Sequence, residues 1–123
     1  MSTTLEHFQA ATLSLTRAGS IKDRLTDAYR NHLAFVDEND LPTELCDEFR
    51  ALTHTLTRER PLLRGEDALR ATVRKMSNHE AAEVASAVVR IFAAVSRANL
   101  NIARVAAKNG SSVVPFYLAE APA

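Results

Sequence analysis

Residues 77–108 read SNHEAAEVASAVVRIFAAVSRANLNIARVAAK. Small and apolar side chains recur in this stretch at steps of three and four, which is the spacing of one face of an α-helix. The pattern, here called the seam, is sustained over more than three heptads, so it predicts one long helix that needs a partner surface. The seam consists of Ala81, Val84, Val88, Ile91, Val95, Ala98, Ile102 and Val105.

Signals at both ends delimit this long helix. Ser77 and Glu80 have the S-x-x-E spacing of a capping box, which predicts a start near Asn78. Asn109 and Gly110 then predict an end near residue 108. Charged residues recur every seven positions on one narrow stripe, and the positions flanking the seam are largely uncharged, so we expect the helix to be enclosed on most of its circumference. The stripe is Glu83, Arg90, Arg97 and Arg104.

The remainder of the chain predicts four shorter helices. We expect the first over about residues 4–18, with Gly19 as a left-handed cap, and the second over about 21–36, with Ser20 as its N-cap. The third should cover about 41–59, with Asp40 as its N-cap. The fourth should lie between a loop at 60–65 and Ser77 and carry an ion pair between Glu66 and Arg70. The sequence thus predicts an all-α bundle of about five helices with a long C-terminal spine. Residues 1–110 form one domain, and we expect the apolar first half of the tail, 111–123, to dock.

Composition narrows the class of protein. The 123 residues include 15 Lys and Arg and 15 Asp and Glu, so the net charge is zero. That balance removes the usual signature of a nucleic-acid or anionic-membrane binder. No apolar run is long enough to span a bilayer, a basic and apolar leader is missing, and a single cysteine forms no internal disulfide. We therefore expect a cytoplasmic protein with no membrane partner.

The sequence contains only weak matches to catalytic or metal-binding motifs. His79 and Glu80 resemble the start of the zinc-binding H-E-x-x-H pattern, but position 83 is Glu, and Glu80 has a capping role. Cys46 is followed by two acidic residues, Asp47 and Glu48, and acidic neighbours disfavour a reactive thiolate, so the sequence favours a packing role for Cys46 over a nucleophilic one. We expect no catalytic residue, metal or cofactor, and we favour a protein that is not an enzyme.

Two groups of residues are candidates for binding. His32 projects near the middle of an apolar helical face, so it is either an acid/base or pH-sensing group or, as we predict, a structural core histidine. Six cations against three acids lie between residues 58 and 75 and either receive an anion or form solvated faces paired with acidic residues. The cations are Arg58, Arg60, Arg64, Arg70, Arg74 and Lys75.

The seam gives the leading functional hypothesis. A helix of about 30 residues is longer than four short helices can cover, so we expect a homo-oligomer, most simply a dimer, acting as an interaction or adaptor protein. The predicted interface comprises Val88, Ile91, Val95, Ala98, Ile102 and Val105. The alternatives are a nucleic-acid-associated regulator using the basic region, and a small ligand-binding protein or enzyme built around His32 and arginines. A further protein partner is compatible with the first hypothesis, whereas the zero net charge argues against tight nucleic-acid binding.

Overall fold

The structure is a computed structural model that describes residues 2–108, and the expected docked tail at 111–123 lies outside the described residues. Within the described part there are α-helices and short 3-10 turns and no strand, which confirms the predicted all-α bundle with a long C-terminal helix. The elements are α1 (Ser2–Ser14), α2 (Ile21–Asn31), η1 (Leu33–Phe35), η2 (Glu38–Asp40), α3 (Thr43–Leu56), α4 (Ala68–Lys75) and α5 (Asn78–Lys108).

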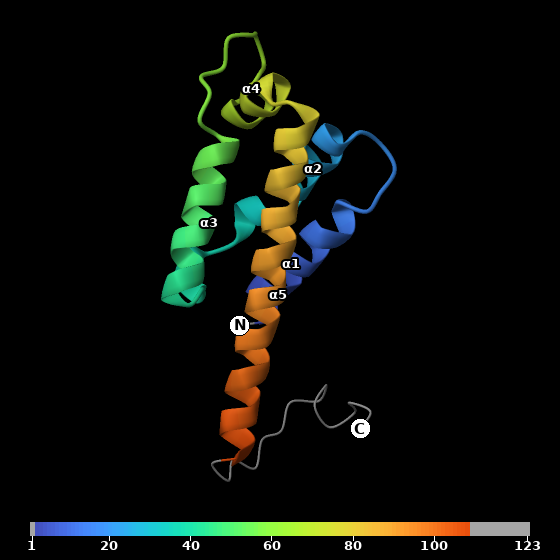
Figure 1. The fold of residues 1–123 in the computed structure, drawn as a ribbon. Helices are drawn as coiled ribbons and strands as arrows, with labels where there is room; N and C mark the ends of the chain where they lie inside the picture. The colour runs from blue at the N-terminus through green and yellow to red at the C-terminus, as the bar shows by residue number, and fades with distance from the viewer. Residues whose placement is uncertain (1, 109–123) are drawn as a thin grey trace.

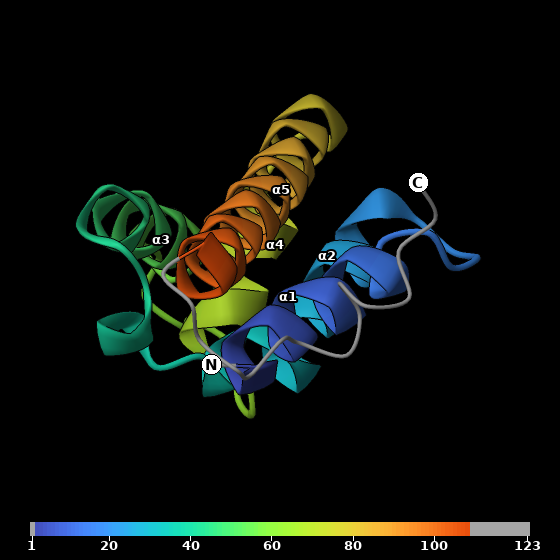
Figure 2. The ribbon, with the colours of Figure 1, turned by 90° about the horizontal axis from the view of Figure 1, so that it is seen from below.

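Helix α5 is the spine of the bundle. It contacts α1 and α2 on one side and α3 on the other, as the view along α5 shows (Figures 1 and 2). Helix α4 packs against α2 and α3 at the end where α5 begins (Figure 1). The first part of the seam is buried in this arrangement, from Ala81 to Val95. Phe8 and Phe49 pack edge-on in the same core, with 5.7 Å between ring centroids.

The predicted start of α5 is confirmed in detail. The Ser77 amide donates to Glu80 Oε1 at 3.1 Å, and the Glu80 amide donates to Ser77 Oγ at 3.0 Å, which completes the capping box. Met76 has an extended backbone (φ −69°, ψ 147°), so α4 and α5 are separate helices. The side chain of Met76 is buried, which anchors the corner between them.

The first two helices are shorter than predicted. Helix α1 ends at Ser14 rather than near residue 18, and the chain reaches Gly19 through turns, with the predicted left-handed conformation at that glycine (φ 114°). Helix α2 ends at Asn31 rather than near residue 36. His32 leaves the helical region (φ −134°), and the following 3-10 turn buries Leu33 in the core. Burial of one side chain therefore outweighs continuation of the helix.

The predicted cap at Asp40 is wrong. Helix α3 begins at Thr43 after Pro42, and no side chain caps it. Asp37 instead accepts a hydrogen bond from the Asn39 amide at 3.0 Å and opens the turn η2, while the carboxylate of Asp40 accepts one from the Thr4 hydroxyl at 3.3 Å. The predicted end of the third helix near residue 59 is also too late, because α3 stops at Leu56.

Candidate interaction surfaces

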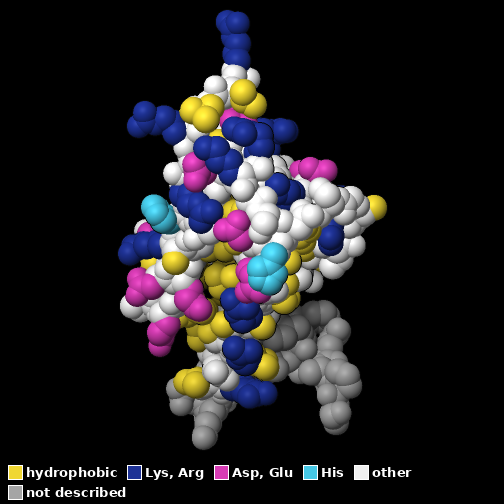
Figure 3. All heavy atoms as spheres, turned by 45° about the horizontal axis from the view of Figure 1, so that its top comes forward, with side chains coloured by type: hydrophobic (Ala, Val, Ile, Leu, Met, Phe, Trp, Pro, Cys, Tyr) yellow, Lys and Arg dark blue, Asp and Glu magenta, His cyan; other side chains and the backbone are white. Residues whose placement is uncertain are grey.

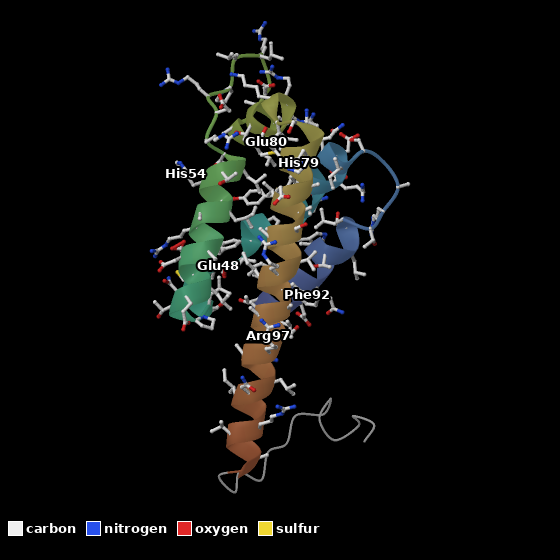
Figure 4. All side chains as sticks on the ribbon, in the orientation of Figure 1. Glu48, His54, His79, Glu80, Phe92 and Arg97 are labelled. Carbon is white, nitrogen blue, oxygen red and sulfur yellow. The ribbon has the colours of Figure 1, made fainter. Side chains whose placement is uncertain are left out.

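The outer part of α5 projects beyond the bundle, and we call residues 96–108 the arm (Figure 1). Ile102 and Val105 continue the face that the buried seam presents upstream, yet they are 68% and 57% exposed. Arg97 and Arg104 are also exposed, and neither forms an ion pair with a described residue (Figure 4 shows Arg97). The arm thus combines an uncovered apolar stripe with surplus positive charge.

Three of the six residues predicted to form an interface are buried within the chain itself. Val88, Ile91 and Val95 are 0%, 3% and 7% exposed, because α1, α2 and α3 of the same chain already cover them. Side chains with so little accessible surface cannot contact a partner chain. Of the six predicted interface residues, Ile102 and Val105 are exposed and Ala98 is half-buried.

The basic residues gather at the opposite end of the molecule, over α4 and the connection that precedes it (Figure 3). Three of the six make ion pairs: Arg58 lies 3.6 Å from Glu80, Lys75 lies 3.2 Å from Glu59, and Arg74 donates two hydrogen bonds to Glu66 at 2.8 and 3.1 Å. The other three make no ion pair within residues 2–108. They are Arg60, Arg64 and Arg70.

The predicted Glu66–Arg70 pair is wrong, and the fold explains why. Glu66 precedes α4 and its N-cap Asp67, so helical i,i+4 spacing does not apply to it. Its carboxylate turns to Arg74 instead, and its side chain is only 7% exposed. The hydrogen bond from Arg74 holds the pKa of Glu66 below its ordinary value, and the same contact raises the pKa of Arg74.

Asp67 anchors α4 in a similar way. Its carboxylate accepts a hydrogen bond from the Arg70 amide at 2.9 Å and pairs with Arg30 of α2. The Arg70 amide first, and the Arg30 guanidinium next, lower the pKa of this carboxyl group. The N-cap therefore also ties α4 to α2.

A groove of about 610 Å³ runs between the start of α2 and α4. Both signs of charge line it: Lys22, Asp23, Asp27, Glu66, Arg70 and Arg74. Lys22 Nζ donates to the Arg74 carbonyl at 3.1 Å, at the C-terminal end of α4, where a cation is favoured by the helix dipole. The groove is therefore mixed in charge, whereas a nucleic-acid surface needs a basic concave face.

His32 is half-buried at the C-terminal end of α2. Within residues 2–108, no hydrogen bond or ion pair links its imidazole to the arginines of the basic region, and four open surface grooves in the described part are lined by other residues. The structure therefore does not bring this histidine and those arginines into one site.

The remaining candidates are exposed or engaged elsewhere. His79 and Glu83 lie 3.9 Å apart on the surface, and Glu80 is held by the capping box, where the Ser77 amide first and Arg58 next lower its pKa (Figure 4). His54 is exposed on α3, and Cys46 is half-buried. Among the described residues, no three His, Cys, Asp or Glu side chains gather where they would hold a metal ion.

The fold and these surfaces define a class: a helical bundle whose C-terminal helix extends beyond its core. Comparison of the chain with known protein families, with curated proteins and with solved structures found no match. None of the helices in the described residues is both long and apolar enough to cross a membrane.

Sequence reasoning missed one feature of the basic end. Leu62 and Leu63 are 68% and 58% exposed in the connection between α3 and α4, between two arginines. The available signal was two adjacent leucines inside a segment that Pro61 and Gly65 mark as a loop, since loops lie on the surface.

Proposed function

We propose that this protein is a non-enzymatic interaction module that associates with a second copy of itself through the arm of α5. The observation that carries the proposal is the change along one continuous face: the seam is buried up to Val95, half-buried at Ala98 and exposed at Ile102 and Val105. Helical periodicity is unbroken across that change, so the same apolar stripe that packs within the chain is offered outside it.

The expected strength of this contact is modest. Covering the exposed fractions of Ile102 and Val105 in both copies contributes about 4–8 kcal/mol, from about 1.5–3 kcal/mol for a fully buried side chain. Association costs about 4–15 kcal/mol in lost rigid-body freedom. Close packing of small residues such as Ala98 and Ala106 must therefore add to the contact, and the dimer should dissociate upon dilution.

Light scattering on the full chain over a range of concentrations tests the proposal. We expect twice the chain mass at high concentration, and Ile102→Asp should shift the protein to the monomer because it places a charge in the apolar stripe. Ala107→Asp is the matched control, since Ala107 is exposed, projects to the side of the helix opposite Ile102 and Val105, and receives the same charge. A native chain that is monomeric throughout, or equal effects of both substitutions, would contradict the proposal.

Contact with nucleic acid through residues 58–75 is the second candidate. Arg60, Arg64 and Arg70 favour it because described acidic residues do not neutralise them. The mixed charge of the adjoining groove and the zero net charge weaken it, so we expect only weak, steeply salt-dependent association. A ligand-binding site built on His32 has no comparable support, because no hydrogen bond or ion pair within residues 2–108 joins that side chain to the basic residues.

A further inference from the structure

The connection between α3 and α4 is held in place by hydrogen bonds. The Glu59 amide donates to the hydroxyl of Thr72 at 2.9 Å, and Thr72 is fully buried in α4. Farther along, the Leu62 amide donates to Glu66 Oε2 at 3.4 Å, and the Glu66 amide donates to the Leu63 carbonyl at 3.1 Å. The Thr72 bond thus ties the start of this connection to α4, and the two bonds at Glu66 close a turn within it; the carboxylate of Glu66 pairs in turn with Arg74 of α4.

This connection carries two adjacent leucines on its outside. We call residues 60–64, Arg-Pro-Leu-Leu-Arg, the apex. Leu62 is 68% exposed and Leu63 is 58% exposed, and every residue of the apex is exposed. The apex is therefore an exposed apolar tip with an arginine on each side.

The charge around the tip is positive because the acidic residues near it are engaged. Glu59, Glu66 and Glu80 pair with Lys75, Arg74 and Arg58, and Asp67 pairs with Arg30. Residues 58–75 hold six cations against three acids, a surplus of three positive charges. Arg60, Arg64 and Arg70 supply that surplus, because none of them pairs with an acidic residue among residues 2–108.

We propose that the apex docks on the surface of an anionic lipid bilayer. Leu62 and Leu63 enter the boundary between headgroups and acyl chains, and Arg60 and Arg64 remain at the level of the lipid phosphates. Nucleic acid offers phosphates but no apolar layer for two leucines. A protein partner would need a cavity shaped for a protruding tip, whereas a bilayer deforms around it.

This proposal departs from the expectation of no membrane partner, and the reason is the distribution of charge. That expectation used the charge of the whole chain, which is zero, whereas residues 58–75 alone carry a surplus of three positive charges. The contact is peripheral and needs no spanning helix. It is also independent of self-association, because the arm lies at the other end of α5 (Figure 1).

Co-sedimentation of the full chain with vesicles tests the proposal. Vesicles of phosphatidylglycerol and phosphatidylcholine provide the anionic surface, and phosphatidylcholine alone provides the neutral one. We expect binding to the anionic vesicles that weakens as salt rises. The double substitution Leu62→Ser with Leu63→Ser should weaken it roughly tenfold or more. Arg60→Glu with Arg64→Glu should weaken it by at least a similar factor.

Matched controls separate the apex from general effects. Leu13→Ser changes a leucine on α1 that is 58% exposed, as Leu63 is, and Arg17→Glu reverses an exposed arginine in the turn after α1. Both should bind vesicles like the native chain. Circular dichroism melting of each variant establishes that it is folded, so that lost binding reflects a lost contact.

Four results would overturn the proposal: no sedimentation of the native chain with anionic vesicles, equal binding to neutral vesicles, apex variants that bind like the native chain, and controls that lose binding as the apex variants do. A mobility shift with duplex DNA at about 150 mM salt covers the competing partner. Submicromolar DNA binding that the arginine substitutions abolish and the leucine substitutions leave intact would assign this end to nucleic acid instead. None of these results bears on the arm, which light scattering tests separately.

Discussion

Thr72 joins the α3–α4 connection to the bundle, and Thr72→Val tests how much that single hydroxyl contributes. The side chain is 0% exposed, its hydroxyl donates to the Ala68 carbonyl at 2.8 Å, and it accepts from the Glu59 amide at 2.9 Å. Valine has nearly the same shape and similar helix propensity, so the substitution removes the hydroxyl with little change in packing. The Glu59 amide then loses its partner.

The expected cost follows from that lost partner. A buried or partly buried donor left without an acceptor costs about 1–3 kcal/mol, so Thr72→Val should lower the free energy of unfolding by that amount. Thr72→Ser keeps the hydroxyl and removes one methyl group, at about 0.8 kcal/mol. For a chain of this length, each kcal/mol corresponds to roughly 4 °C in melting temperature. The Thr72→Val variant should therefore have a lower melting temperature than the Thr72→Ser variant, although valine is the more apolar residue.

Thermal melting and limited trypsin digestion together test this reasoning. Besides melting earlier, Thr72→Val should be cut faster after Arg64, because the connection is released from α4, whereas Thr72→Ser should be cut at the native rate. A valine variant as stable as the native chain, or more stable than the serine variant, would refute the argument. It would mean that water replaces the hydroxyl at the Glu59 amide and that this bond does not hold the connection.

Two further predictions concern Glu66 and His32. Because Arg74 lowers the pKa of Glu66 from its ordinary value of 4.5, the stability from this pair is present above about pH 4.5 and is lost as the pH falls below it, through the folded-state pKa. At about pH 7 the Glu66→Gln variant should have a lower melting temperature than the native chain, and at about pH 3 the two melting temperatures should be equal. A difference in melting temperature that stays constant between these pH values would contradict this. His32→Gln should change the melting temperature but leave self-association and vesicle binding within a few fold, and a large loss of either in a folded variant would show that the histidine is more than structural.

The spine of the bundle was predictable because its signals are local. The capping box at Ser77 and Glu80 closes within three residues, and the seam repeats within each turn and the next. Other boundaries depend on contacts between distant segments. The hydroxyl of Thr72 accepts from an amide 13 positions earlier, and the carboxylate of Asp40 is used by Thr4, 36 positions away. Helix propensity contains no information about such partners, so the ends of the second and third helices were misplaced.

The candidate surfaces were predictable only in part, for a related reason. The seam has one periodicity from Ala81 to Val105, and nothing in that pattern marks Val95 as the last residue that neighbouring helices bury. The sequence shows that basic residues outnumber acidic ones between residues 58 and 75. Which of these basic residues pair with acidic residues depends on the fold. Glu66 turns to Arg74, for example, which leaves Arg70 without an acidic partner among the described residues.

The net charge of this chain is zero because acidic and basic segments of the sequence cancel. This distribution of charge gives the two proposed surfaces different responses to salt. Residues 37–48 hold six acids and no cation, whereas residues 84–108 hold four cations and no acid. Two arms that meet therefore bring like charges together, and screening by salt should favour their association. Salt acts in the opposite sense at the apex, because there it weakens attraction between arginines and lipid phosphates. The same added salt should strengthen one contact and weaken the other, a pair of responses that a nonspecifically adhesive protein would not give.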